Sequence, residues 1–315
     1  MTVSRAGGAR AREREKTGMQ AAVSLRLFGP TTLTDALGRP HRLRGKCARI
    51  LGVLGMRAGT AIHKDELADA VWDGTPPASY RQTLDSDVCV LRRRAGLGAV
   101  RSSALVTVRG GYELDPDRVH VDAVDRRDLV DRVIDATSTT ALAVGHPLVR
   151  TSGDILFENE PFWDWGRIVR DEWESVLADG LLHISRSALV CGEPALAQTA
   201  AAAALGLAPD SEAATVHLMR AQWWLGRHND ALRTYVSLQD RLVRELGEIP
   251  QRETQDLYLA LLRDHDRLPS VGAAEDHVRL LLTLLRRTLE QACSPEEGGS
   301  DPDAEGEPER ARASV

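Results

Sequence analysis

The sequence predicts a mainly α-helical protein with a small β part: a winged helix-turn-helix followed by an all-α tetratricopeptide-like domain. Three observations lead to this prediction. Strand-like and helix-like segments follow one another in a defined order over residues 24–114, a 34-residue repeat occurs further along the chain, and the net charge changes sign between the two parts. With 315 residues and 43% hydrophobic content, the chain is large enough for two domains that each bury a core.

The first part of the chain alternates short apolar runs with helical stripes. Ser24–Phe28, Thr31–Thr34 and His41–Leu43 are strand-like runs separated by Gly and Pro. Strands, three helices and a hairpin, in that order, are typical of a winged helix-turn-helix, in which one helix enters the major groove and the hairpin touches the flanking backbone. The predicted helices are Lys46–Arg57, Lys64–Trp72 and Ser79–Ala95, and the predicted hairpin strands are Ala104–Val108 and Tyr112–Leu114.

The third predicted helix is the one rich in arginine, and it is the candidate DNA-reading helix. Leu84, Val88 and Leu91 fall on one face, which we expect to be the core face. The opposite face carries short polar groups that can reach base edges, and guanidinium groups that pair with phosphate or guanine. Arginines at a helix C-terminus also suit the helix dipole, which is the structural alternative. The candidate DNA-binding residues are Gln82 and Ser86 as base readers, Cys89 and Val90 on the same face, Arg92, Arg93 and Arg94 as phosphate anchors, Arg109 at the hairpin tip, and Lys46 and Lys64 at the starts of the other two helices.

The second part of the chain is helical from about residue 170 to 264 and contains an internal repeat. Gly192 and Gly226 lie 34 residues apart, which is the period of the tetratricopeptide repeat. The alternative is that two unrelated helical hairpins match by chance in an alanine-rich region. The matched positions are Gly192, Ala197, Ala201, Ala204 and Pro209 with Gly226, Ala231, Tyr235, Leu238 and Val243, and the last pair departs from the pattern.

These patterns divide the chain into segments with separate roles. The first segment is Arg-rich without apolar periodicity, and Met19 within it is an alternative start of the protein. The last segment is rich in acidic residues, Gly, Pro and Ser. The predicted segments are a disordered basic N-terminus (1–22), the winged-helix domain (23–118), a connector helix near Val124–Asp135, the tetratricopeptide-like domain (124–267), a further helix at Val278–Leu289 and a disordered acidic tail (294–315).

The charge distribution supports a division of labour between the two parts. Residues 1–118 hold 20 Lys and Arg against 12 Asp and Glu, a net charge of +8, and residues 119–315 hold 20 against 34, a net charge of −14. A basic first third suits nucleic-acid binding and an acidic remainder suits protein binding, whereas drift of surface charge is the alternative. We also expect the fragment 19–122 to fold and bind DNA by itself, with a self-contained core.

Several classes of protein are disfavoured by the motifs and the cysteine pattern. There is no P-loop, no H-E-x-x-H and no G-x-S-x-G, so we expect no enzyme, no cofactor and no metal. Cys47, Cys89, Cys191 and Cys293 lie far apart and read as reduced thiols of a cytoplasmic protein. The longest leucine-rich run is too short for a membrane span, and the N-terminus has no secretory signal. The aromatic residues Phe162, Trp163, Trp165 and Trp173 could line a ligand pocket, but we expect them to pack the first helices of the second domain.

The motifs together resemble the Streptomyces antibiotic regulatory protein family over roughly residues 24–267. The resemblance implies an OmpR-type winged helix joined to a bacterial transcriptional activation domain, in a short form without the ATPase module of larger relatives. It also implies action on direct repeats upstream of antibiotic biosynthesis genes. The residues that carry it are Leu27-Phe28-Gly29-Pro30, Val71 to Ser79, Thr83-Leu84, Leu91 to Arg94, Val106 to Tyr112, Leu225 to His228, Ala231-Leu232 and Arg244 to Gly247.

Two features depart from the family pattern. Cys89 and Val90 stand where basic residues are often found, and Asp87 stands where a neutral or basic polar residue is common, so the positive charge at the groove is reduced. His146-Pro147 is expected to break a connector helix that the family usually carries intact.

We therefore predict a sequence-specific DNA-binding transcriptional activator, pathway-specific for a secondary-metabolite cluster. Its expected partners are double-stranded DNA with promoter direct repeats and RNA polymerase holoenzyme, with a homodimer as a further candidate and no membrane. Two alternatives remain open from the sequence. One is an interaction adaptor whose winged helix packs against protein, and the other is a repressor that uses the same DNA site.

Overall fold

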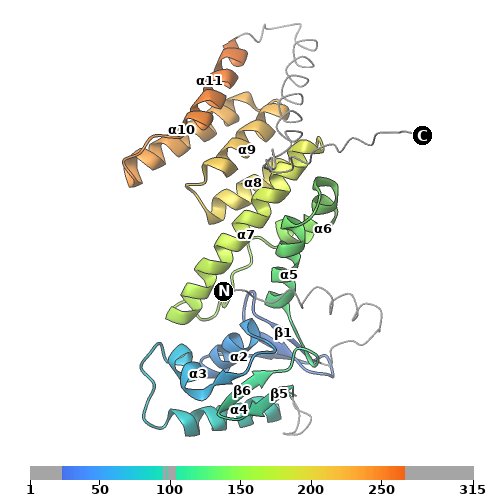
Figure 1. Ribbon diagram of the computed structural model, residues 1–315, viewed down its shortest axis with the longest axis vertical. Helices are drawn as coiled ribbons and strands as arrows, with labels where there is room; N and C mark the ends of the chain where they lie inside the picture. The colour runs from blue at the N-terminus through green and yellow to red at the C-terminus, as the bar shows by residue number, and fades with distance from the viewer. Residues whose placement is uncertain (1–22, 95–96, 98–103, 267–315) are drawn as a thin grey trace, which may run out of the picture. The chain divides into compact units, whose positions relative to one another are not determined.

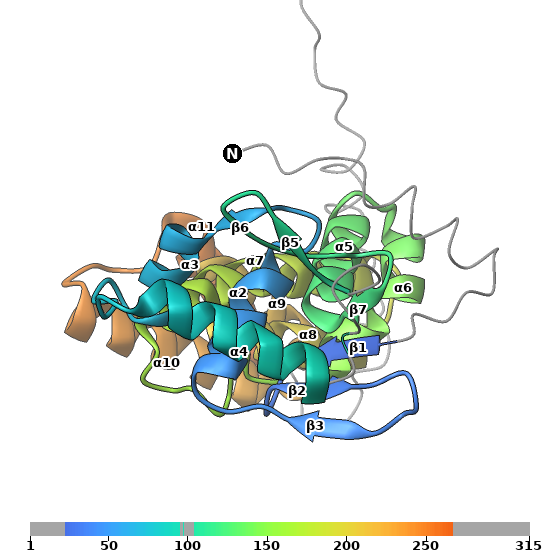
Figure 2. The same cartoon turned by 90° about the horizontal axis from the view of Figure 1, so that it is seen from below.

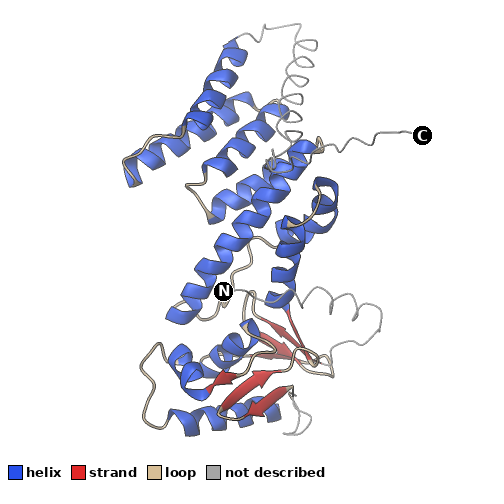
Figure 3. Cartoon of the chain, in the orientation of Figure 1, coloured by secondary structure: helices blue, strands red, loops and turns tan. Residues whose placement is uncertain are grey.

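The computed structural model describes residues 23–94, 97 and 104–266 of the chain. The described part is mostly helical with a small β part near its N-terminal end, which confirms the predicted fold class (Figures 1 and 3). The predicted basic N-terminus, the helix at residues 278–289 and the acidic tail lie outside the described residues.

The N-terminal sheet joins strands from both ends of the winged-helix domain. Its order is β3 (Pro40–Arg42), β2 (Thr32–Thr34), β1 (Val23–Arg26) and β7 (Val119–Val121). β1 pairs antiparallel with β2 and parallel with β7, so that Leu25 lies opposite Val121. The sequence pattern did not predict β7, because three residues that pair with a strand almost a hundred positions away carry little local signal.

The helix-turn-helix and its hairpin occur in the predicted order. They comprise α2 (Lys46–Met56), β4 (Ile62–His63), α3 (Lys64–Val71), α4 (Tyr80–Arg94), β5 (Leu105–Val108) and β6 (Gly111–Leu114). The second sheet has the order β4-β6-β5, and β4 was not predicted. Gly110 closes the hairpin at a φ of 83°, which a side chain rarely adopts. Figure 2 looks onto α4, the third predicted helix, at the front of this domain.

All elements after β7 in the described part are helical. They are α5 (Asp122–Ile134), α6 (Ser138–Arg150), α7 (Asp164–Val190), α8 (Pro194–Leu207), α9 (Glu212–Trp224), α10 (His228–Glu245) and α11 (Arg252–Asp266). The expectation that His146-Pro147 breaks the connector helix is wrong, because α6 continues through Pro147 to Arg150. Pro147 lies in the last turn, where its carbonyl still accepts bonds from the Thr151 amide (3.1 Å) and hydroxyl (2.8 Å), so the lost amide donor costs little.

The 34-residue repeat corresponds to two helical hairpins, α7–α8 and α9–α10. Gly192 and Gly226 end the first helix of each hairpin with φ values of 77° and 74°. In both turns the next amide bonds back to the helix, Glu193 N to Ala188 O and Arg227 N to Gln222 O, each at 2.8 Å, which is the Schellman arrangement. The departure at Pro209 and Val243 also has a physical reason: α8 stops at Leu207, whereas α10 continues past Val243 to Glu245.

The core of the winged helix is completed from the helical part, so the expectation of a self-contained fragment 19–122 is wrong. Phe157 and Trp163 are both fully buried, and a Cβ at Gly52 of α2 would lie 3.0 Å and 3.1 Å from their rings. Trp173 packs edge-on against Phe28, with ring centroids 5.2 Å apart. These aromatic residues are therefore packing residues, as expected, but they pack against the winged helix rather than only among the first helices of the second domain.

Candidate nucleic-acid interface

The start of α4 is fixed by a carboxylate of α3. Asp65 accepts hydrogen bonds from the Tyr80 hydroxyl and from Arg81 Nη2, the latter at 3.0 Å and 3.2 Å to its two oxygens. The hydrogen bond from Tyr80 and then that from Arg81 hold the pKa of Asp65 below its usual value. Arg81 is a cation at the start of α4 that the sequence analysis missed, although its position next to Gln82 was the signal available.

The middle of α4 is tied to both α3 and the hairpin through Asp85. Lys64 Nζ lies 2.6 Å from Asp85 Oδ1, and the Tyr112 hydroxyl of β6 donates to the same oxygen. Lys64 and then Tyr112 lower the pKa of Asp85, and burial raises the pKa of Tyr112. Lys64, one of the predicted phosphate contacts, is therefore engaged within the domain.

The end of α4 is tied to the hairpin by Arg92. Its Nη2 donates to Leu105 O at 2.7 Å and to Thr107 Oγ1 at 2.7 Å, and its Nε donates to Leu105 O at 3.0 Å. A guanidinium group that saturates a strand in this way positions the hairpin relative to the helix. The side chain of Arg94, the last residue of α4, is outside the described part.

The remaining candidates on α4 share one outward face. Gln82, Ser86, Cys89 and Arg93 are exposed, and Val90 at the edge of this face is half-buried. Arg93 Nε contacts Cys89 O of its own helix at 3.4 Å, and Arg93 forms no ion pair with any carboxylate of the described residues. Asp87 lies toward the protein, with Oδ2 buried, so its charge is turned away from the outward face.

Two further candidates lie elsewhere in the domain. Arg109 is exposed at the tip of the β5–β6 hairpin, where it extends the basic surface beyond the helix. Lys46 is exposed at the start of α2, with Nζ 5.5 Å from the centre of the Trp72 ring. The α2 N-terminus beside it already binds a carboxylate, because Gly45 N donates to Glu160 Oε1 at 2.7 Å, so this end is less suited to a phosphate.

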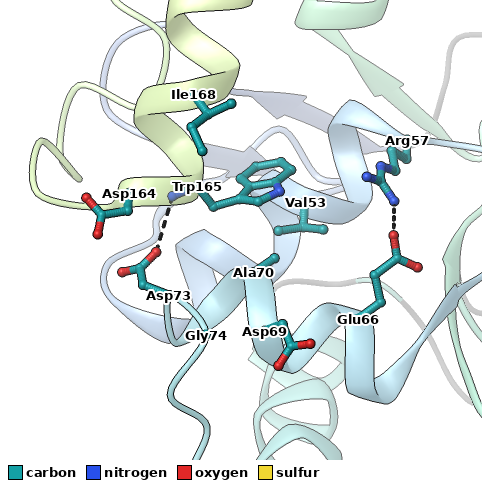
Figure 4. Close-up of a pocket in the computed structure, with 10 residues that line it drawn as sticks. All are labelled: Val53, Arg57, Glu66, Asp69, Ala70, Asp73, Gly74, Asp164, Trp165 and Ile168. Atoms are coloured by element: carbon teal, nitrogen blue, oxygen red, sulfur yellow. Dashed lines mark hydrogen bonds and ion pairs between the residues drawn. The ribbon is translucent and has the colours of Figure 1, made fainter. Parts of the chain in front are cut away.

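A pocket of about 350 Å³ lies where the turn after α3 meets the start of α7 (Figure 4). Trp165 and Ile168 form its apolar wall, and the Trp165 amide donates to Asp73 Oδ1 at 3.2 Å. Asp69, Asp73 and Asp164 give the rim a negative character. Carboxylates repel phosphate, so this pocket does not continue the candidate DNA surface.

Two searches of the described residues bear on other functions. No group of three or more His, Cys, Asp and Glu side chains is placed to hold a metal ion among the residues that the structure describes. Within the same residues, no helix combines the length and apolar character that crossing a bilayer requires.

Comparison with known proteins agrees with this architecture. Residues 154–262 match the bacterial transcriptional activator domain. The regulatory protein DnrI of Streptomyces peucetius is 29% identical over 240 residues, which cover 69% of this chain and 84% of DnrI. The regulatory protein AfsR of Streptomyces griseus is 27% identical over 225 residues, or 70% of this chain, which spans only 22% of AfsR.

More distant relatives extend the comparison to solved structures. The transcriptional regulatory protein MoaR1 of Mycobacterium tuberculosis is 26% identical, over 77% of this chain and 80% of MoaR1. The structure of Mycobacterium tuberculosis EmbR in complex with a low-affinity phosphopeptide superposes with a TM-score of 0.66 at 18% identity, over 86% of this chain and 72% of EmbR. At this identity the likeness bears on the fold alone, and the fold is the same winged helix with tetratricopeptide-like helices.

Proposed function

We propose that this chain, a relative of the Streptomyces antibiotic regulatory proteins that carries a bacterial transcriptional activator domain, is a sequence-specific DNA-binding activator of transcription. Residues 23–118 bind direct repeats near a promoter, and residues 124–267 engage RNA polymerase holoenzyme and mediate any self-association. The target is a secondary-metabolite cluster, as the names of the relatives suggest, and the protein acts in the cytoplasm.

The observation that carries the proposal is the division of the basic residues around α4 into two sets. Lys64, Arg81 and Arg92 are engaged with partners inside the domain and hold the helix in place. Arg93 and Arg109 are exposed and form no ion pair with a described carboxylate, so both are available to phosphates or guanine. A helix anchored on its inner side with polar groups facing outward suits insertion into the major groove.

The exposure of this face also favours DNA binding over the adaptor alternative. In an adaptor the outward face of α4 would pack against protein, yet within this chain Gln82, Ser86 and Cys89 contact solvent. Activation and repression use the same DNA surface, so they are distinguished by transcription from a purified template with RNA polymerase holoenzyme.

The test of DNA binding is the salt dependence of affinity for a promoter direct repeat, measured by fluorescence anisotropy. Arg93→Ala and Arg109→Ala should each weaken binding and reduce the slope of log affinity against log salt by about 0.9, because each removes one phosphate contact. Arg233→Ala, on the exposed surface of α10, is the control of equal charge and should leave the slope unchanged. Unchanged binding by both variants at low salt contradicts the assignment of helix and hairpin.

A further inference from the structure

Residues 155–165, here called the strap, cross from the connector helices to α7 and lie along the winged-helix domain. The backbone of the strap pairs with the end of β1: Gly29 N donates to Ile155 O at 2.8 Å and Phe157 N donates to Leu27 O at 2.9 Å. Phe28 and Leu156 form an antiparallel bridge at this point. The strap therefore holds the end of β1 by backbone pairing before any side chain is considered.

Asn159 of the strap fastens the β2 side of the domain. Its Oδ1 accepts from the backbone amide of Thr31 at 3.0 Å and from the Thr31 hydroxyl at 3.1 Å, and its Nδ2 donates to Leu43 O at 2.9 Å. Thr31 is fully buried, so these bonds satisfy polar groups that have no access to water. Both ends of this amide are thus used to join the strap to the winged helix.

Glu160 of the strap begins a chain of contacts that reaches the turn before α4. Its Oε1 accepts from Gly45 N at 2.7 Å and its Oε2 accepts from Arg49 Nε at 3.1 Å, with the Glu160 side chain only 10% exposed. Arg49 Nη1 in turn donates to Val71 O at 3.1 Å and to Asp73 Oδ2 at 3.3 Å. Charge-assisted bonds of this kind are among the stronger polar contacts in proteins.

The chain of contacts closes on itself at Asp73. The other carboxylate oxygen of Asp73 accepts from the Trp165 amide at 3.2 Å, at the end of the strap (Figure 4). Asp73 has a φ of 52°, a conformation that costs free energy for a residue with a side chain and persists only when the surroundings impose it. The turn that leads from α3 toward α4 is therefore held by the strap, through Arg49 on one side and Trp165 on the other.

We infer that the strap fixes the DNA-reading helix relative to the activator domain, with Glu160 and Asp73 as positioning residues that touch no DNA. The inference rests on the proposed function only where it concerns DNA, since the placement itself is a property of the free protein. A fixed placement means that the DNA contact and the polymerase contact are delivered as one rigid body. The Trp163 indole supports the same placement, because its Nε1 donates to Ala70 O of α3 at 2.7 Å.

The first experiment measures the placement without DNA. Spin labels on two exposed native cysteines, Cys89 on α4 and Cys191 at the end of α7, report the distance between the two domains in the full chain, with Cys47→Ser and Cys293→Ser removing the other thiols. The unsubstituted strap should give one narrow distance distribution. Glu160→Gln should broaden it, because an amide cannot pair with Arg49. Glu158→Gln is the matched control, since Glu158 is an exposed strap residue only two positions away.

A second variant keeps the inference testable if Glu160→Gln fails to fold. Asp73→Gly tolerates the left-handed φ while it removes the links to Arg49 and Trp165, so the domain should fold with a released turn. A broadened distribution in Asp73→Gly supports the strap as a positioning device. A narrow, unshifted distribution in a folded Asp73→Gly or Glu160→Gln overturns it.

The second experiment measures DNA affinity and its salt slope for the same full-length variants on a promoter direct repeat. Glu160→Gln and Asp73→Gly should lose roughly tenfold in affinity with an unchanged salt slope, because no phosphate contact is removed. A slope reduced by about one would mean that a phosphate contact is lost, and would overturn the positioning role. If the unsubstituted chain binds no DNA, the proposed function fails, while the distance measurement still decides the strap.

Discussion

The winged helix and the tetratricopeptide-like helices are stabilised in different ways. In the hairpins α7–α8 and α9–α10, each turn is closed by neighbours in sequence, as the equivalent bonds after Gly192 and Gly226 show. In the winged helix, the sheet is completed by β7 and the core by Phe157 and Trp163, all distant in sequence from what they contact. The comparison teaches that the domain proposed to bind DNA depends for its stability on the domain proposed to activate transcription.

The largest effect should come from removing the strap altogether. A fragment of residues 19–122 exposes Leu27, Phe28 and the surface of α2 that Phe157 and Trp163 cover. Because burying each large aromatic is worth about 3–5 kcal/mol, the loss of both is comparable with the whole stability of a small domain. The fragment should lack a cooperative thermal transition by circular dichroism, whereas a chain of residues 19–267 should show one. A cooperative transition in the shorter fragment would show that the two domains are independent.

The same contrast explains what the sequence could and could not predict. The core face of α4 was predicted from Leu84, Val88 and Leu91, because helical periodicity is a local property, and all three are buried. The repeat was predicted from Gly192 and Gly226 for the same reason.

The elements that escaped prediction depend on distant partners. β7 has three residues and acquires its strand character from β1, and the strap has no periodicity at all. Within the candidate site, sequence spacing placed Lys64 and Arg92 near DNA, but their carboxylate and carbonyl partners become visible only when α3, α4 and the hairpin are folded together.

A single-residue version of the comparison is Trp163→Ala. The substitution removes a fully buried indole between α2, α3 and the strap, together with its hydrogen bond to Ala70 O at 2.7 Å. We expect a loss of about 3–5 kcal/mol in the free energy of unfolding, measured with guanidinium chloride. Trp224→Ala, at a half-buried position of α9, is the control and should cost less. An equal loss for both would mean that Trp163 contributes no more than an ordinary repeat residue.

The helical domain should be the more acid-sensitive of the two because of His217 on α9. Burial, and then the positive charges of Arg220 and Arg186, lower the pKa of His217 to about 4. The folded domain therefore keeps this imidazole neutral while the unfolded chain takes up a proton near pH 6.5, so stability is full above that pH and is lost as pH falls toward 4.

The measurement is the free energy of unfolding at pH 7 and pH 5 for the parent chain and for His217→Gln. The parent should lose about 2 kcal/mol more than the variant over this interval, since each unit between the two pKa values is worth about 1.4 kcal/mol. His146→Gln, at an exposed position of α6, controls for removing a histidine. Equal pH dependence in parent and His217→Gln would show that His217 is protonated in the fold.

The smallest effect concerns the outward face of α4, where the chain departs from its relatives. Val90 is half-buried at the edge of the face that carries Gln82, Ser86 and Arg93, so it can touch a thymine methyl but cannot pair with phosphate. Val90→Arg can extend its guanidinium group to solvent from this edge, and one added phosphate contact should steepen the salt slope by about 0.9. Melting temperature and salt-dependent affinity are measured together for this variant. A gain in binding at unchanged melting temperature is expected if the face enters the groove. A lower melting temperature with no gain in binding would mean that the arginine is desolvated against protein, and would favour the adaptor over the DNA-binding activator.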